Sequence, residues 1–217
     1  MSSKSMPDQP PGFTALDPTK PITRYFRHLP HWRQDGATYF ITYRLNDALP
    51  TSVKESLEIE RAWLKEHPEA EEAEQRLRQV LVLLNKVLDQ GYGACHMRTV
   101  AHREILSEVF EHSDRDRYDL FTHVIMPNHV HLVCRPLGDW SLQSAVQSWK
   151  GISARRMNQH MGKAGSLWQD ESYDRIVRDS EHLKKVVRYI HRNHVECLEH
   201  STFYIRPEWG DWFKKIV

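Results

Sequence analysis

The sequence is poor in cysteine and has no long apolar run. Its 217 residues include three cysteines, which stand far apart. So few thiols build neither a disulfide framework nor a zinc ribbon, and we expect a reducing, cytoplasmic environment. No stretch of about 18 apolar residues occurs, which excludes an ordinary membrane-spanning helix. The first residues, MSSKSMPDQPPG, lack the apolar segment of a signal peptide, so we expect none.

Glycine and proline are also scarce, with 9 and 11 residues. This excludes a collagen or a long low-complexity tract, and 40% hydrophobic residues suffice for one globular core. Five prolines fall within residues 1–22, which we expect to form a flexible tail. We expect one domain over residues 23–200 and a C-terminal segment over residues 201–217 that packs back on it.

Charge is balanced overall and uneven along the chain. The formal net charge is +1. Residues 53–90 hold 6 Lys/Arg and 9 Asp/Glu, whereas residues 141–195 hold 10 Lys/Arg and 5 Asp/Glu. The C-terminal half therefore offers the surface that is more attractive to anions, although most of these charges suit solvated helix faces.

Hydrophobic periodicity predicts alternating strands and helices. Alternation and β-branched residues predict strands at 37–45 and 166–178 and a hairpin at 118–136, with Pro127 and Asn128 in its turn. Apolar stripes predict helices at 53–66, 69–89, 100–112, 141–161 and 180–198. This order matches the α+β, ferredoxin-like arrangement, an antiparallel sheet with helices on one face. The helical residues 53–98 are then an insertion in the first crossover.

The strongest local signal is Asn128-His129-Val130-His131 on the second strand of the hairpin. Side chains at i and i+2 share one face of a strand, so two imidazoles can bind one divalent ion there. Two hydrogen-bonded structural histidines are the simpler alternative, since the chain has 14 histidines. A nucleotide hydrolase with three alternating histidines would need a third one at Val133. A zinc site with Cys134 would need a bulge, because that residue faces the other side.

A second signal lies on the last predicted helix. Tyr189 and Asn193 are four residues apart and share one helical face, with Lys185 and Arg192 on or beside it. A phenol, an amide and two cations on one face suit a phosphate diester. The alternative is a tyrosine at the edge of the core with its hydroxyl in water.

These motifs together resemble the REP-associated tyrosine transposases, relatives of the single-tyrosine HUH insertion-sequence transposases. The resemblance rests on RHLPHWRQDGATYFITYRL, PNHVHLV, SLWQDESYDRIVRD and VVRYIHRNHV in this order, and it covers about residues 27–198. It implies that His129 and His131 bind Mg²⁺ or Mn²⁺. It also implies that Tyr189 is the nucleophile and that Asn193 completes the metal ligation.

The sequence departs from the family pattern at His194, where the family has proline after the asparagine. This change is expected to lengthen the helix or shift its end. Tyr173 is the rival nucleophile, but it falls in a predicted strand rather than on the helix.

The resemblance implies cleavage and rejoining of single-stranded DNA through a covalent 5′-phosphotyrosine, with a REP-like hairpin as substrate. Further DNA contacts are expected from the cations Lys150, Arg155, Arg156, Lys185 and Arg192, and base stacking from Trp140, Trp149 and Trp168; the alternative for Trp149, which lies on the apolar stripe, is a place in the core. A hydrolytic nuclease without a tyrosyl adduct and a catalytically idle DNA-binding module are the alternatives. Either a monomer or a homodimer fits. A cytoplasmic protein, associated with the nucleoid when bound to DNA, is expected.

Overall fold

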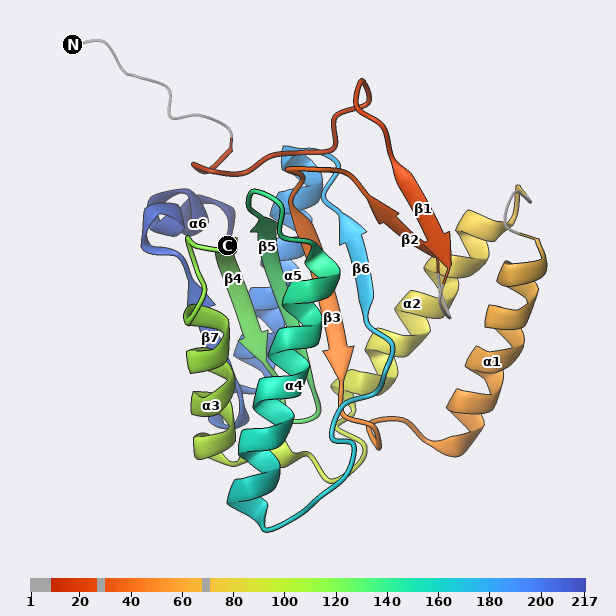
Figure 1. Ribbon diagram of the computed structural model, residues 1–217, viewed down its shortest axis with the longest axis vertical. Coiled ribbons are helices and arrows are strands. Elements are labelled where there is room, and N and C mark those ends of the chain that lie inside the picture. The colour runs from red at the N-terminus through yellow and green to blue at the C-terminus, as the bar shows by residue number, and fades with distance from the viewer. Residues whose placement is uncertain (1–8, 27–29, 68–70) are drawn as a thin grey trace.

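The computed structural model describes residues 9–26, 30–67 and 71–217. Its elements alternate between helices and strands, as the sequence predicts (Figure 1). The strands are β1 (Thr23–Phe26), β2 (Pro30–Arg33), β3 (Tyr39–Arg44), β4 (Tyr118–Ile125), β5 (His129–Pro136), β6 (Tyr173–Ile176) and β7 (Thr202–Ile205). The helices are α1 (Thr51–Glu66), α2 (Ala73–Asp89), α3 (Val100–Glu111), α4 (Leu142–Met161), α5 (Ser180–Glu196) and α6 (Gly210–Ile216).

Five strands form one antiparallel sheet in the order β6-β3-β5-β4-β7. The connections from β3 to β4 and from β5 to β6 each carry helices and each skip one neighbouring strand. This is the split βαβ topology of the predicted ferredoxin-like class, which the structure confirms. β1 and β2 form a separate two-stranded hairpin.

Helices cover both faces of the sheet. In Figure 1, α4 lies in front of the sheet and α5 behind it. Val130 and Leu132 of β5 belong to the core on the α3 and α4 side, together with Trp149. Val133 points to the other side and packs in a second cluster with Val187 of α5. The sequence predicts helices on one face of the sheet, and α3 and α4 cover that face. The tyrosine-bearing helix α5 covers the opposite face of the sheet.

The predicted insertion in the first crossover is the helix pair α1 and α2, which stands beside the β6 edge in Figure 1. Leu57 and Leu64 bury the inner side of α1, while Leu84 and Leu88 do so for α2. The pair ends at Asp89, close to the start of β5. Among the described residues, no helix is both long and apolar enough to cross a membrane.

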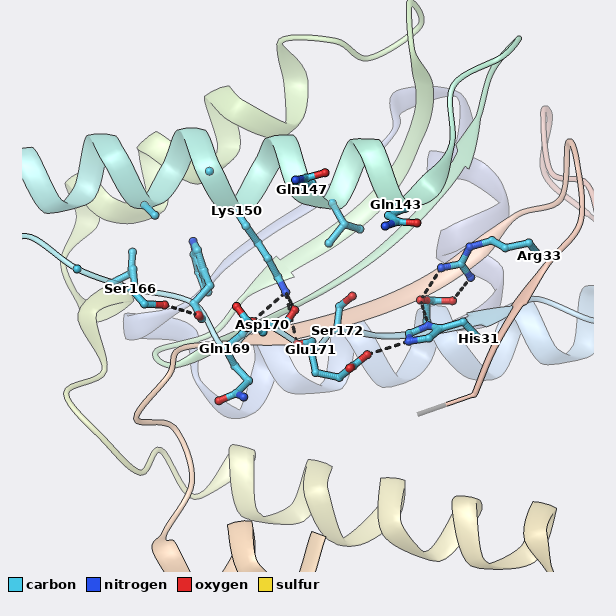
Figure 2. Close-up of a pocket in the computed structure, with 17 residues that line it drawn as sticks. His31, Arg33, Gln143, Gln147, Lys150, Ser166, Gln169, Asp170, Glu171 and Ser172 are labelled. Atoms are coloured by element: carbon cyan, nitrogen blue, oxygen red, sulfur yellow. Dashed lines mark hydrogen bonds and ion pairs between the residues drawn. The ribbon is translucent and has the colours of Figure 1, made fainter. Parts of the chain in front are cut away.

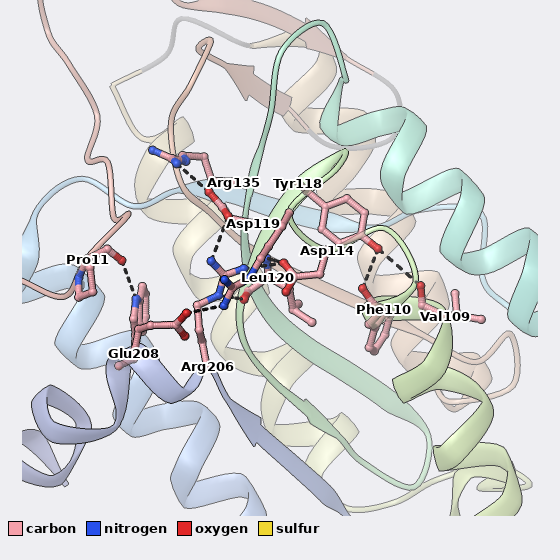
Figure 3. Close-up of polar contacts among 12 residues, drawn as sticks. Pro11, Val109, Phe110, Asp114, Tyr118, Asp119, Leu120, Arg135, Arg206 and Glu208 are labelled. Carbon is pink, nitrogen blue, oxygen red and sulfur yellow. Dashed lines mark hydrogen bonds and ion pairs between the residues drawn. The ribbon is translucent and has the colours of Figure 1, made fainter.

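The prediction of a flexible tail over residues 1–22 is wrong for its second half. Phe13 is buried in the cluster on the α5 side. The backbone N–H of Thr38 donates to the carbonyl of Thr14 at 2.9 Å, and the indole N–H of Trp209 donates to the carbonyl of Pro11 at 2.8 Å (Figure 3). An apolar side chain and paired backbone groups hold this proline-rich segment on the body. Residues 1–8 lie outside the described part.

The C-terminal segment packs back on the domain, and β7 extends the main sheet beside β4. Arg206 fastens it there, because its guanidinium lies 3.0 Å from an oxygen of Asp119 and 2.5 Å from one of Asp114 (Figure 3). Its Nε also donates to the carbonyl of Leu120 at 2.7 Å.

Residues 166–169 are a loop, although the sequence predicts a strand. Only an isolated bridge joins Trp168 to Leu45. The ammonium of Lys150 on α4 donates hydrogen bonds to the backbone carbonyls of three loop residues, as Figure 2 shows. The distances are 3.0 Å to Gln169, 3.1 Å to Asp170 and 3.4 Å to Glu171. Carbonyl groups that converge on one cation are not available to a neighbouring strand, so the ladder starts only at β6.

Candidate active site

The candidate site contains a pair of histidines at the start of β5. His129 and His131 are fully buried on the face that α5 covers, and their Nε2 atoms lie 3.0 Å apart. Nδ1 of His129 lies 2.7 Å from Oδ1 of Asn128, and Nδ1 of His131 lies 2.7 Å from the hydroxyl of Thr42. Partners on Nδ1 orient both rings and leave the Nε2 atoms to face each other. This arrangement is typical of histidines that bind a metal.

Electrostatics keep both imidazoles neutral. Burial lowers the pKa of His129 to about 3, and the nearby charge of Arg44 acts in the same direction. Burial, together with His129, lowers the pKa of His131 well below its ordinary value. A metal ligand must offer a free lone pair, so this protonation state fits a cation between the rings.

Asp89 is the third potential ligand, and the sequence analysis missed it. Its Oδ1 lies 3.8 Å from Nε2 of His129, and one ligand atom from each of Asp89, His129 and His131 falls within 4.8 Å of the others. Burial raises the pKa of Asp89 to about 6, with a further contribution from Glu196. Two imidazoles and a carboxylate form a mixed nitrogen and oxygen set that suits Mn²⁺ and permits Mg²⁺.

Tyr189 meets the histidine pair from α5. Its Oη lies 3.2 Å from Nε2 of His131, and the two rings are 5.0 Å apart. Asp179 caps α5 by accepting from the backbone N–H of His182 at 2.7 Å, and Ile190 anchors the helix in the core. The same chain thus brings the phenol and the imidazoles together.

The phenol is protonated at neutral pH in this environment. Burial raises the pKa of Tyr189, and the charge of Asp89 adds to that effect. Asn193 and Arg192 oppose it, and the Arg192 guanidinium lies 5.5 Å from the centre of the phenol ring. A metal cation beside the phenolate would act in the same direction as Asn193 and Arg192 and lower the pKa of Tyr189.

Asn193 lies one turn beyond Tyr189 and is 2% exposed. Its amide donates to the carbonyl of Tyr189 at 2.8 Å, which holds the side chain next to the phenol. The helix runs on through His194 to Glu196, and Nδ1 of His194 lies 2.8 Å from the hydroxyl of Ser201. Histidine in place of the family's proline therefore leaves α5 continuous beyond the site.

Tyr173, the rival nucleophile, faces the same side of the sheet from β6. It pairs in register with Thr42 and packs in the cluster with Tyr189. Burial raises its pKa, and nearby Arg175 opposes this. No hydrogen bond among the described residues joins it to either histidine, so the geometry favours Tyr189.

The predicted DNA-binding cations fall on both faces of the molecule. Lys185 lines a cavity beside Tyr189 whose wall also holds Arg175 and Arg178, two cations that the sequence analysis did not single out. The α4 cations lie on the other face. Lys150 binds loop carbonyls, and Arg156 pairs with Glu108 at 2.5 Å.

The tryptophans proposed for stacking differ in exposure. Trp149 and Trp168 are buried at 1% and 4% exposure, and their indole N–H groups bond to Tyr118 and Ser153. Trp140 is 44% exposed, and the guanidinium of Arg117 lies 4.4 Å over the centre of its ring. Cys134 is buried on the face opposite the histidines, where burial raises the pKa of its thiol.

Residues 96–193 match the model of the family described as IS200-like transposases. Among solved structures, one of a REP-associated tyrosine transposase bound to a REP hairpin is 17% identical, with a TM-score of 0.42 over 79% of this chain and 73% of that one. A candidate transposase from Deinococcus radiodurans R1 is 16% identical, with a TM-score of 0.32 over 72% and 90% of the two chains. No curated protein sequence matches the chain.

The family match begins just before α3 and ends at Asn193, so it includes β5 and most of α5. It confirms the resemblance drawn from the sequence motifs. Residues 96–193, which carry the histidine pair and Tyr189, are thus similar to the IS200-like transposases, and this similarity spans slightly less than half of the chain.

Proposed function

We propose that the protein cleaves and rejoins single-stranded DNA through a covalent 5′-phosphotyrosine on Tyr189, with a REP-like hairpin as substrate. One observation carries the proposal: the Tyr189 hydroxyl lies 3.2 Å from His131 Nε2, within a buried pair of neutral imidazoles. A nucleophile and a metal-ligand set of this kind meet where phosphodiester chemistry needs both.

The residues fit a divalent cation. His129, His131 and Asp89 would hold it, and Asn193 would complete the set from α5. When bound, Mn²⁺ or Mg²⁺ would withdraw electron density from the phosphorus of the scissile phosphate and favour the phenolate.

The protein's own groups then carry the reaction. The Tyr189 hydroxyl loses its proton to water and its oxygen attacks phosphorus in line, so that a new O–P bond forms and the bond to the 3′-oxygen breaks. That oxygen takes up a proton and leaves as a 3′-hydroxyl. The new tyrosyl ester conserves the energy of the broken phosphodiester bond, so a 3′-hydroxyl can reverse the step without ATP. Phe40, whose ring lies 6.2 Å from that of Tyr189 at 86°, helps to hold the phenol toward His131.

DNA is expected to approach the α5 side of the sheet, where Arg175, Arg178 and Lys185 line the cavity beside Tyr189. Arg192 extends this basic surface. The α4 cations Lys150, Arg155 and Arg156 stay predicted contacts for a more distant part of the hairpin. One chain supplies both histidines and the tyrosine, so a monomer suffices for the chemistry. We expect it to act in the cytoplasm, on the nucleoid.

The experiment is a denaturing gel after incubation with Mn²⁺ and labelled single-stranded hairpin DNA. We expect a covalent adduct with the wild type and with Tyr173→Phe, and none with Tyr189→Phe. Cleavage without an adduct would indicate a hydrolytic nuclease instead. Tight binding without cleavage would indicate a DNA-binding module, and either result would overturn the proposal.

A further inference from the structure

Arg44 is a buried cation at the edge of the candidate active site, and no described residue pairs with its guanidinium. It ends β3 and pairs in register with His129, so both side chains leave the sheet on the same face. It is 7% exposed. Within the described part of the chain, no hydrogen bond or ion pair reaches its guanidinium. Arginine is rarely buried so deeply unless it is paired.

A second arginine lies within electrostatic reach of it. Arg61 comes from α1, and its Nε is buried without a hydrogen-bond partner among the described residues. Burial lowers the pKa of Arg44 to about 10, and the charge of Arg61 contributes to the same shift. A buried guanidinium that a partly buried one repels costs free energy unless an anion joins them.

The acidic group that acts on Arg44 already has other partners. Glu171 raises the pKa of Arg44 and so lies within electrostatic reach of it. Its carboxylate, however, is 2.8 Å from Nε2 of His31, a histidine that also contacts Asp174. Glu171 therefore shares its charge with a cation on the other side, and the arginine pair keeps an excess of positive charge.

Arg44 also borders the histidines, since it pairs in register with His129 and its charge lowers the pKa of that residue. We propose that Arg44 and Arg61 form a binding site for a backbone phosphate of the single DNA strand, next to the phosphate that Tyr189 attacks. The site rests on the proposed function for the identity of its ligand. Guanidinium groups suit this ligand because their planar donors match two phosphate oxygens at once.

This site would give the helical insertion a role in substrate binding. α1 supplies Arg61, and α2 supplies Asp89 to the neighbouring histidine pair. The strand would then be held by Arg44 and Arg61 next to the histidines and by the cavity beside Tyr189, which Lys185 of α5 and Asn85 of α2 both line.

The test uses Tyr189→Phe as the parent, so that binding is measured without cleavage. The probe is a short fluorescein-labelled single-stranded oligonucleotide, titrated with Mn²⁺ present at several KCl concentrations. We expect Arg44→Met to weaken binding about tenfold or more and to lower the salt slope by about 0.7, the value for one lost phosphate contact on a single strand. The control is Arg115→Gln, an exposed residue just before β4 that pairs with Glu208 and has no role in the proposed DNA surface, and it should bind as the parent does.

Thermal unfolding separates this role from a structural one. Removal of an unpaired buried charge should leave the melting temperature of Arg44→Met unchanged or raise it. A lower melting temperature with unchanged DNA binding would overturn the proposal. Arg61→Gln, at a partly exposed position, supplies the same test if Arg44→Met does not fold, and an unchanged salt slope for it would also count against the site.

The outcome is independent of the tyrosine chemistry. If the wild type forms no adduct but Arg44→Met still loses affinity and salt slope, the proposed reaction fails and the phosphate site stands. If the adduct forms normally in Arg44→Met at low DNA concentration, the site fails and the reaction stands.

Discussion

His31 is held between two carboxylates, and this arrangement predicts how stability changes with pH. Its ring nitrogens lie 2.8 Å from Glu171 and 2.7 Å from Asp174, and the residue is 3% exposed (Figure 2). Burial alone would lower the pKa of His31, but the two carboxylates outweigh it and raise the pKa to about 9. Because the folded pKa is above the ordinary value of 6.5, the charged ring stabilises the fold below pH 6.5.

This stabilisation disappears as pH rises through 9. The interval between 6.5 and about 9 corresponds to about 3 kcal/mol of unfolding free energy. We expect His31→Gln to be less stable than the wild type by about that amount near pH 6, because it leaves Glu171 and Asp174 close together without the cation between them.

Urea unfolding at several pH values between about 6 and 10 measures this effect. The gap between the wild type and His31→Gln should narrow as pH rises, since the wild-type ring becomes neutral. The difference in unfolding free energy between the two proteins isolates His31, because both proteins share every other group that titrates in this range. A gap that stays constant across the range would refute the assignment of a charged His31.

Three further outcomes follow from the site and the fold. His129→Ala should abolish cleavage and leave hairpin binding in a gel shift largely intact; equal cleavage would refute the metal assignment. Equal mixing of His129→Ala with Tyr189→Phe should restore no adduct on a gel, because each chain completes its own site; restored activity would show a tyrosine helix exchanged between subunits. Arg206→Met should lower the unfolding free energy by about 3 kcal/mol in urea, because it strips a buried cation from Asp114 and Asp119; an unchanged midpoint would contradict this.

Periodicity sufficed for the central fold because strong patterns coincide with the crossover topology. The alternation around Met126-Pro127-Asn128 gives the β4–β5 hairpin, and the apolar stripe of residues 141–161 gives α4. Short or irregular segments carried no such signal. β7 has four residues and owes its place to Arg206, and the loop at 166–169 owes its shape to Lys150. Both depend on side chains that are distant in sequence.

The residues of the candidate site likewise divide into those with a local sequence pattern and those without one. The spacing of His129 and His131 and the position of Tyr189 on an amphipathic helix are local patterns, and the structure brings these residues together. Asp89 and Arg44 have no local signature. An aspartate at a helix end and an arginine at a strand end are ordinary surface residues until the chain folds and places them beside the histidines.

The most direct measurement of the central claim is peptide mapping of the DNA-linked protein. The protein is incubated with Mn²⁺ and hairpin DNA, then digested with nuclease and trypsin, and the modified peptide is sequenced by mass spectrometry. We predict a residual nucleotide on Tyr189 and on no other residue. A nucleotide on Tyr173, or no modified peptide while the DNA is cut, would contradict the account.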